Sequence, residues 1–313
     1  MSEKMPVTDL LNESFTFGFQ RFFTVLRCLL VPYIILIFGL IIVAVGLLDF
    51  DMISRLESDI MPEPESFEDV MAIVNSIFRG SWQSALGLFV LAATVLSLPL
   101  YGGIASIFRL VGLGEEPGGW FTLRLDGPMW RTFFAWLIIG ILQYVFYGIG
   151  FLIAFSMNPE MFDFFQNLDR LDDDPTPLFG FMGGLFFAGF LALILMMFFF
   201  TKLAPFPAAS ACENRLMLVN SWSRTKGHFW TILGGYIMLV LALFFANMAF
   251  QILTSVLQGI FTAVSAMGGE ALMGIMVLIV TIVVLVATIA FTVFTTGVQM
   301  AFPAVIYRRL WRD

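Results

Sequence analysis

Hydrophobic and polar residues are arranged along this chain in long blocks. Six stretches contain no Asp, Glu, Lys or Arg, and each can hold a membrane-crossing helix, which needs about 20 mostly apolar residues. These stretches are Cys28–Leu48, Gly80–Phe108, Thr132–Pro159, Pro175–Thr201, Gly227–Gly269 and Ala271–Tyr307. The pattern predicts an all-α, polytopic membrane protein with six transmembrane helices in a single membrane domain, residues 1–313.

The fifth stretch is long enough for two spans. Its last part, QGIFTAVSAMGG, is rich in small and polar residues. Two spans here would also leave the chain ends on opposite sides of the membrane. We therefore expect one span followed by an interfacial extension.

Composition supports a membrane protein, and the positions of the cations predict its orientation. The chain is 59% hydrophobic and only 12% charged, whereas soluble domains carry roughly 25% charged residues. Of the 16 Lys and Arg residues, 13 fall in residues 1–27, 109–131, 202–226 and 308–313. Because cytoplasmic loops of membrane proteins are enriched in Lys and Arg, both termini are expected in the cytoplasm.

The segments that flank the spans follow a recurring order. The first, third and fifth spans each follow an aromatic and basic segment, and the other three approach the cytoplasm with a proline. This order predicts three helical hairpins, residues 1–113, 114–215 and 216–313. Residues 14–26 align without gaps on residues 221–233, so we hypothesise that the hairpins form a pseudo-repeat.

Residues 9–27, before the first span, have the spacing of an amphipathic helix. The apolar positions that recur at intervals of three and four are Leu11, Phe15, Phe19, Phe22 and Leu26. Aromatic residues on one side and arginines on the other favour a helix lying in the cytoplasmic interface. A helix end continuous with the first span fits the same pattern.

Four prolines near the cytoplasmic ends of the even-numbered spans are candidate helix breaks or hinges. Proline removes a backbone donor and clashes with the preceding turn of a helix. We expect a kink at Pro99, the end of the fourth span at Pro205 and Pro207, and the end of the sixth at Pro303.

The two loops opposite the basic segments are acidic. Within the first loop, residues 66–78 (SFEDVMAIVNSIF) predict a short amphipathic helix. The second contains Asp172, Asp173 and Asp174 but lacks the Asp-x-Asp-x-Asp-Gly pattern of a calcium loop. We expect no metal site and no cofactor.

Two segments around the end of the fourth span carry a family resemblance. They are LAPFPAASACE at 203–213 and NSWSRTKGHFW at 220–230. They resemble the YciC-like bacterial inner-membrane proteins and the related membrane domains of some glycerophosphodiester phosphodiesterases. The resemblance implies a multi-pass protein of the bacterial inner membrane. It carries over no catalytic residue.

The sequence offers little for catalysis. His228 is the single histidine, and no HExxH, GxSxG or Walker pattern occurs. No charged residue lies within a predicted span, so ion-coupled transport lacks its usual signature. We expect no enzyme activity and no nucleic-acid partner.

Our first functional hypothesis is a non-enzymatic role in envelope or lipid homeostasis. Basic groups at headgroup level attract anionic lipids, so the cytoplasmic interfacial helices are expected to bind membrane lipids or a membrane-protein partner. The candidate headgroup residues are Arg21, Arg27, Arg131, Arg224, Lys226, His228 and Trp230. The alternative reading is that these residues only set topology and anchor depth.

The second hypothesis is a passive transporter, channel or lipid-translocating protein with a path between the hairpins. Polar side chains within spans must face protein or water, because lipid cannot satisfy their hydrogen bonds. The residues expected to line such a path are Gln143, Tyr147, Asn247, Gln251, Thr292 and Gln299.

Overall fold

The computed structural model describes residues 5–48, 75–78, 81–118, 125–157, 176–213, 215–266 and 270–312, and all named elements in these residues are α-helices. In chain order they are α1 (Val7–Gln20), α2 (Phe22–Leu47), α5 (Trp82–Leu113), α6 (Gly127–Met157), α8 (Thr176–Leu203), α9 (Phe206–Cys212), α10 (Leu218–Arg224), α11 (Phe229–Ala266) and α12 (Glu270–Trp311). Six helical segments are long and apolar enough to cross a membrane. The all-α, six-span prediction is confirmed, and the chain is a multi-pass membrane protein.

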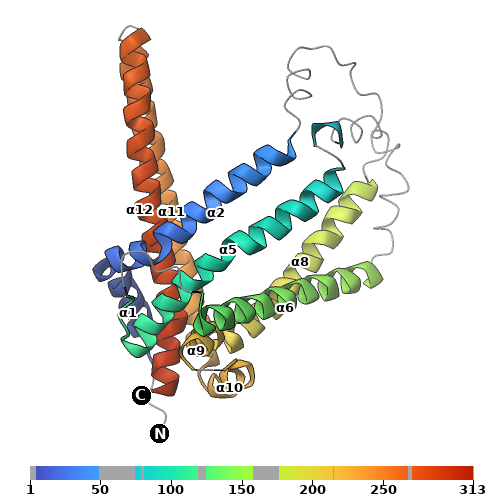
Figure 1. Cartoon of the computed structure of the whole chain (residues 1–313). Helices are drawn as coiled ribbons and strands as arrows, with labels where there is room; N and C mark the ends of the chain where they lie inside the picture. The colour runs from blue at the N-terminus through green and yellow to red at the C-terminus, as the bar shows by residue number, and fades with distance from the viewer. Residues whose placement is uncertain are drawn as a thin grey trace.

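The membrane-crossing helices pack as successive antiparallel pairs. Helix α2 lies against α5, α6 against α8, and α11 against α12. Figure 1 shows that the α11–α12 pair diverges from the other two pairs, while all three converge at the end of the molecule that holds both termini. Consecutive helices thus form the hairpins expected from the sequence.

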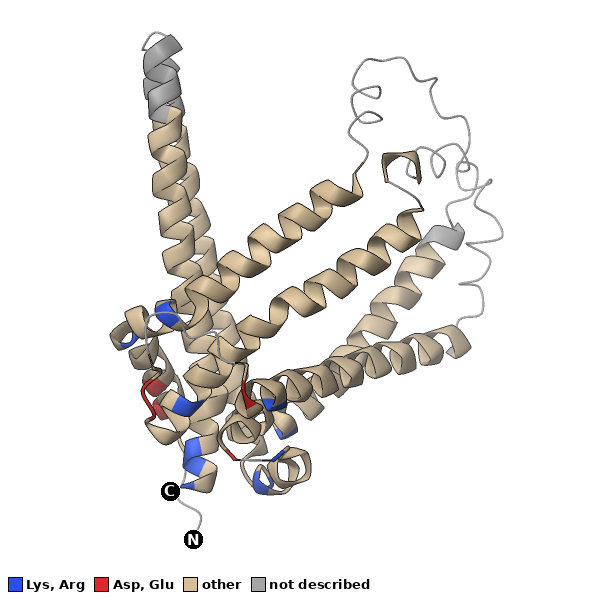
Figure 2. Cartoon of the chain, viewed as in Figure 1, with Lys and Arg blue, Asp and Glu red and all other residues tan. Residues whose placement is uncertain are grey.

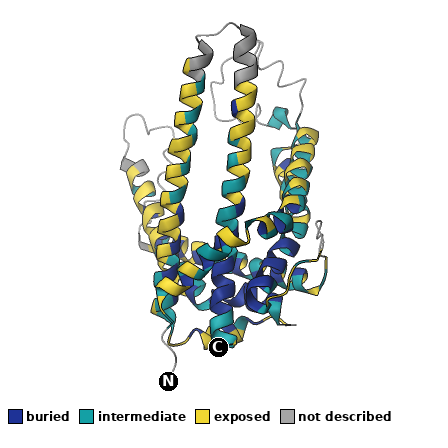
Figure 3. Cartoon of the chain, turned by 90° about the vertical axis from the view of Figure 1, so that its left-hand side faces the viewer, coloured by how far each residue is buried: buried dark blue, intermediate teal, exposed yellow. Residues whose placement is uncertain are grey.

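The protein core lies at this convergent end, which we call the base. It consists of α1, α9, α10, the ends of α2 and α11 near the chain termini, and the adjoining ends of α5 (Gly102–Leu113) and α12 (Val298–Trp311). Figure 3 shows the buried residues gathered in the base and the exposed residues along the rest of the hairpins. Phe108, Phe302 and Tyr307 are among the fully buried side chains.

The outer parts of the hairpins expose apolar side chains. Examples are Ile42 on α2, Leu91 on α5, Phe186 on α8 and Val283 on α12, each about half exposed or more. In a bilayer this surface faces acyl chains, which are as apolar as the side chains themselves. The helices form here because in lipid each backbone N–H and C=O must be satisfied within the segment.

Charged residues in the described part of the chain are concentrated at the base. Figure 2 shows the described Lys and Arg residues there, around α1, α9, α10 and the chain ends. The prediction that both termini lie in the cytoplasm depends on this clustering of Lys and Arg at one end of the spans. The side of the membrane that the base faces remains a prediction.

Two prolines do not end their helices. Helix α5 continues through Pro99 to Leu113, and α12 continues through Pro303 to Trp311. The expectation that the sixth span ends at Pro303 is therefore wrong. Neighbouring helices can satisfy the backbone groups that a proline frees in a membrane helix, and Pro303 lies where α12 enters the packed base.

The third proline site does interrupt the chain. Helix α8 ends at Leu203, and α9 begins at Phe206 with Pro205 as its N-cap and Pro207 in its first turn. Proline suits the first helical turn, where the backbone N–H has no intrahelical acceptor. The break turns the chain from the span into the base.

Residues 9–27 form two helices. Helix α1 ends at Gln20, and Arg21 lies outside helical geometry before α2 begins at Phe22. The buried face of α1 is Leu10, Ser14 and Gly18, one position before the expected aromatic stripe. A Cβ at Gly18 would lie 2.6 Å from Val298 Cγ2, so small residues let α1 pack closely on α12.

The start of the third hairpin matches the start of the first. In the gapless alignment Phe22 corresponds to Phe229, and these residues begin α2 and α11. The aligned Ser14 and Ser221 are both buried. These agreements are compatible with a pseudo-repeat, which remains a hypothesis.

The fifth charge-free stretch forms one continuous helix, α11, up to Ala266. Its interfacial extension is therefore not a separate element. Of the amphipathic helix expected at 66–78, residues 75–77 are helical, and Phe78 pairs with Leu48 in an isolated antiparallel bridge. Residues 66–74 and Asp172–Asp174 lie outside the described residues.

Candidate functional site

Helix α9 is the centre of the base. Its residues from Phe206 to Ala211 are all buried, and it contacts α5, α6, α10 and α12. Three of these residues are alanine and one is serine, so the backbones of several helices can approach α9 closely. The stretch that contains it, 201–233, therefore organises the packing of the base.

Two arginines bind the end of α9. Arg131 Nε of α6 donates to the backbone oxygen of Ser210 (3.1 Å), and Arg109 Nη1 of α5 donates to that of Ala211 (3.2 Å). The last carbonyls of a helix have no intrahelical donors. These guanidinium groups satisfy two of them, and the bond from Arg109 joins the first hairpin to the second.

The neighbouring polar groups connect α9 to its other partners. Tyr307 Oη of α12 donates to Glu213 Oε1 (2.8 Å), and the backbone N–H of Met217 donates to Ser210 Oγ (3.1 Å). Buried polar groups that are paired in this way fix one arrangement of the helices. The base is thus a hydrogen-bonded hub.

Several candidate headgroup residues contact protein atoms. Arg21 pairs with Glu116 at 2.8 Å, and Arg131 binds α9. Arg224 Nη1 donates to the backbone oxygen of Leu310 (2.6 Å), and its guanidinium lies 4.8 Å from the centre of the Trp311 ring. These three arginines therefore hold helices together in addition to placing positive charge at the base.

The remaining candidates lie nearer the surface. Lys226 and Trp230 are exposed, and His228 is half-buried with its backbone N–H donating to the oxygen of Thr225 (3.2 Å). Arg27 is half-buried in the second turn of α2. Residues 224–230 therefore form an exposed basic and aromatic corner of the base.

A separate ion-pair group joins α1 to α12. Glu13 pairs with both Arg308 and Arg309, and Arg308 also lines a cavity of about 220 Å³ with Arg21 and Glu116. Two carboxylates balance the arginines in that cavity, so the group serves to fix α1 against the base. No sequence pattern signals this pairing, because its partners are almost 300 residues apart.

A wide cavity lies between the second and third hairpins. It measures about 810 Å³, within the size range of small-molecule and cofactor sites. Trp136 of α6 and Phe200 of α8 form one side, and residues of α11 and α12 form the other. Four expected path residues line it: Asn247, Gln251, Thr292 and Gln299.

The other two expected path residues lie elsewhere. Gln143 lines a small space between α6 and α8, beside Phe146 and Phe199. Tyr147 is 45% exposed on α6 and does not line the cavity. The structure therefore brings together the polar residues of the third hairpin and leaves those of the third span apart.

The cavity-lining polar residues belong to a longer series, which we call the polar stripe. Its members are Asn247, Gln251, Thr254 and Gln258 on α11 and Thr281, Thr288, Thr292, Thr295 and Gln299 on α12. Their spacing of three, four or seven residues places each set on one face of its helix. This helical spacing is the signal that would have found Gln258, Thr281, Thr288 and Thr295 from the sequence.

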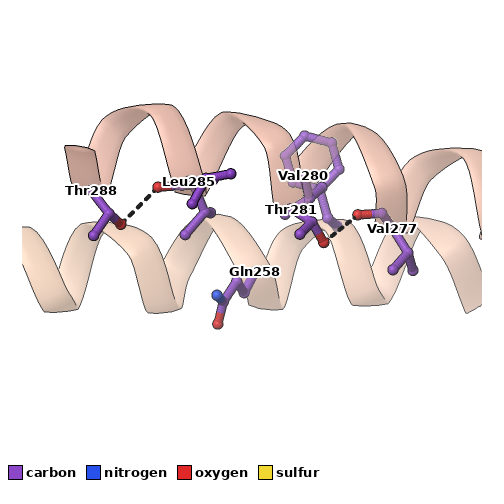
Figure 4. A pocket seen from close by; sticks show the side chains of 8 residues that line it. Gln258, Val277, Val280, Thr281, Leu285 and Thr288 are labelled. Carbon is purple, nitrogen blue, oxygen red and sulfur yellow. Dashed lines mark hydrogen bonds between the residues drawn. The ribbon is translucent and has the colours of Figure 1, made fainter. Parts of the chain in front are cut away.

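The stripe continues into a second cavity of about 490 Å³ between α11 and α12. Figure 4 shows Gln258, Thr281 and Thr288 around this space. Thr288 lines both cavities. From Thr281 to Gln299 the stripe covers 19 residues of α12, and the 18 steps between them span about 27 Å at the α-helical rise of about 1.5 Å per residue.

Three threonines of the stripe on α12 use their hydroxyl protons in bonds within the helix. Thr281, Thr288 and Thr295 donate to backbone oxygens four residues earlier, at 2.8, 2.7 and 3.0 Å. Their oxygen lone pairs remain as acceptors. Gln251 Nε2 lies 3.4 Å from Asn247 Oδ1, which leaves the other amide groups to donate or accept. The stripe thus presents uncharged donors and acceptors.

Comparison with known proteins adds no relative: no family model, curated protein or solved structure matches this chain. The resemblance to the YciC-like group therefore remains a prediction. Within the described residues, no three His, Cys, Asp or Glu side chains gather closely enough to share a metal ion.

Proposed function

We propose that this chain is a bacterial inner-membrane protein that gives an amphipathic lipid passive passage along the polar stripe of α11 and α12. The observation that carries the proposal is the cavity of about 810 Å³, lined by Asn247, Gln251, Thr292 and Gln299. We propose no catalytic role. Both termini and the base face the cytoplasm in this arrangement.

The length of the stripe supports a path that crosses the membrane. Its extent of about 27 Å along α12 is close to the roughly 30 Å thickness of a hydrocarbon core. Helix tilt shortens its projection on the membrane normal, yet most of the apolar layer is still traversed. A purely structural pair of lipid-facing helices has no need for such a series.

The polarity of the stripe supports a polar occupant. Asn247, Gln251 and Gln299 are exposed in the protein alone, and an unpaired amide in hydrocarbon costs several kcal/mol. Water or a lipid headgroup removes this cost by hydrogen bonding. The stripe is therefore best explained as a surface that a mobile polar group contacts.

The surroundings of the stripe support a lipid as that group. Leu239, Val240 and Phe244 line the same cavity as the amides, so a headgroup can bind the stripe while acyl chains contact apolar residues. The stripe contains no ionisable residue, which favours passive movement over coupling to protons or ions.

The test is lipid exchange in reconstituted vesicles of phosphatidylcholine and phosphatidylglycerol that carry a trace of headgroup-labelled fluorescent lipid. We expect the wild-type protein to expose label on the inner leaflet to dithionite, a membrane-impermeant quencher. The double variant Gln251→Leu/Gln299→Leu should exchange lipid roughly 30-fold more slowly, because two hydrogen bonds of about 1 kcal/mol each are lost along the path.

Gln143→Leu is the matched control, since it removes the same side chain from a helix outside the stripe. It should exchange lipid at the wild-type rate. The proposal is wrong if wild-type vesicles behave as protein-free vesicles, or if both variants lose the same activity. Entry of dithionite itself, measured with an encapsulated soluble dye, would instead identify a solute channel.

A further inference from the structure

Lys202, in the last turn of α8, occupies an aromatic setting at the exposed corner of the base. Its ammonium lies 5.9 Å from the centre of the Trp222 ring and 5.7 Å from that of Phe229. These are cation–π distances. Thr225 Oγ1 donates to the backbone oxygen of Lys202 (3.1 Å), which fixes the loop after α10 against the end of α8.

The aromatic setting is built from three helices. Phe198 of α8 contacts Trp222 of α10 at 5.8 Å and Phe229 of α11 at 5.4 Å between ring centres. Phe199 contacts Trp222 at 5.3 Å, and Phe229 contacts Trp230 at 5.2 Å. Trp230 is 79% exposed, so a Trp side chain is available at headgroup depth, where Trp is enriched in membrane proteins.

The corner carries positive charge that protein carboxylates do not neutralise. Among the described residues, no Asp or Glu oxygen lies within 4.0 Å of the Lys202 ammonium, whereas Arg21 and Arg308 have such partners. Lys226 is exposed on the same corner. Glu213, the carboxylate nearest in sequence, accepts a hydrogen bond from Tyr307.

An apolar track runs along α8 from this cation. Phe190, Ile194 and Phe198 precede Lys202 at intervals of four on one helix face, and they are 55%, 51% and 42% exposed. The track extends about 18 Å from Lys202, which exceeds half of a hydrocarbon core of about 30 Å. A cation at its end and apolar residues along it match a phosphate headgroup joined to an acyl chain.

We infer that this corner is a binding site for an anionic phospholipid, with the headgroup phosphate on Lys202 and one acyl chain along Phe190, Ile194 and Phe198. The site is separate from the polar stripe. Lys202 and Phe200, which lines the cavity, lie about 160° apart around α8, because two residues at about 100° each give a rotation of about 200°. The inference therefore does not depend on lipid passage.

The simplest alternative is that Lys202 only extends its charge to the membrane surface over apolar rings. In that case any anionic lipid interacts through the general field of the base. The two explanations differ in whether Lys202 contributes more than an exposed lysine nearby. Lys226 provides that comparison, because it is exposed and makes no ring contact among the described residues.

The experiment measures lipids bound to the full-length protein after delipidation and addition of phosphatidylglycerol, by native mass spectrometry. Lys202→Gln should weaken binding at least fivefold, the factor that corresponds to about 1 kcal/mol for one lysine at headgroup level. Lys202→Arg should retain most of the binding, and Lys226→Gln should change it less than twofold. Phosphatidylcholine should bind more weakly than phosphatidylglycerol.

Two further measurements test the aromatic ring beside Lys202 and the contribution of the acyl chain. Trp222→Leu preserves every charge but removes one ring beside Lys202, and it should also weaken phosphatidylglycerol binding. Inorganic phosphate in excess should not displace the lipid, because the acyl chain contributes to its affinity. Any of three results would overturn the inference. They are equal losses of phosphatidylglycerol binding for Lys202→Gln and Lys226→Gln, wild-type binding by properly folded Lys202→Gln, and full displacement of the lipid by phosphate.

Discussion

Gly103 should be one of the least replaceable residues of the first hairpin. Helices α2 and α5 cross there so closely that a Cβ added at Gly103 would lie 2.3 Å from the backbone oxygen of Cys28 and 3.2 Å from its carbonyl carbon. Optimal contacts between heavy atoms are about 3.5–4.0 Å. Because a helix carbonyl cannot rotate away, Gly103→Ala requires the two helices to separate by about 1 Å.

The separation acts on the packed base. Leu29 and Ile107 are fully buried within one turn of the crossing, and their contacts loosen when the helices move apart. Overpacking of this kind costs about 1–3 kcal/mol. We expect Gly103→Ala to lower the free energy of unfolding by about 2 kcal/mol, despite the higher helix propensity of alanine.

The measurement is thermal unfolding in detergent, followed by loss of the monodisperse peak in size-exclusion chromatography. At a few degrees per kcal/mol, the apparent Tm of Gly103→Ala should fall by about 4 °C or more. Gly87→Ala is the matched control in the same helix, because no atom lies within 4 Å of its added Cβ. Equal Tm values for the two variants would refute the proposed close crossing.

Two other predictions concern the base and the orientation of the chain. Glu13→Gln should weaken the attachment of α1 to α12, because Arg308 and Arg309 lose the carboxylate of Glu13. The backbone amides of α1 should then exchange hydrogen faster. Asp9→Asn, at an exposed position of the same helix, is the control and should leave this exchange unchanged. Single cysteines placed at Ile60 or Arg170 should react with a membrane-impermeant maleimide added to intact cells, and one at Asp313 should react only after lysis. Labelling of Asp313→Cys in intact cells would contradict the predicted topology.

The sequence was sufficient to predict the spans because charge is excluded from lipid. Helix α2 runs from Phe22 to Leu47, and the first charge-free stretch, Cys28–Leu48, covers most of it. One error occurs at the base, where helix ends are covered by protein. The sixth span was predicted to end at Pro303, because proline within a helix of a soluble protein costs about 3 kcal/mol or more. Helix α12 nevertheless continues beyond it.

The base itself could not be predicted from residue types. Helix α9 owes its central position to the small size of its alanines, and small residues carry no periodic hydrophobic signal. The donors to its last carbonyls, Arg109 and Arg131, are about 100 and 80 residues away in the chain. From the sequence, Arg109 was counted among the orienting cations and Arg131 among the candidate headgroup residues, because a contact from a side chain to a distant backbone oxygen has no sequence pattern.

The candidate path was partly predictable for a similar reason. Asn247 and Gln251 are one helical turn apart, so their shared face follows from the sequence. Gln143 is chemically equivalent to Gln251, but it lies in the α6–α8 contact. Residue type shows that such a group needs a polar partner or water, and only the packing of the hairpins decides which of the two it obtains.

The position of the core explains how a polar stripe can remain accessible in a membrane. The hydrogen bonds and buried aromatic residues that hold the hairpins together lie in the base, whereas the outer parts of the hairpins expose apolar side chains. Replacing a helix–helix contact by a helix–lipid contact has little hydrophobic cost, since acyl chains are as apolar as Leu. The third hairpin can therefore stay apart from the second in the bilayer while the base stays packed. A lipid headgroup can then reach Asn247 and Gln251 from the side without disrupting the fold.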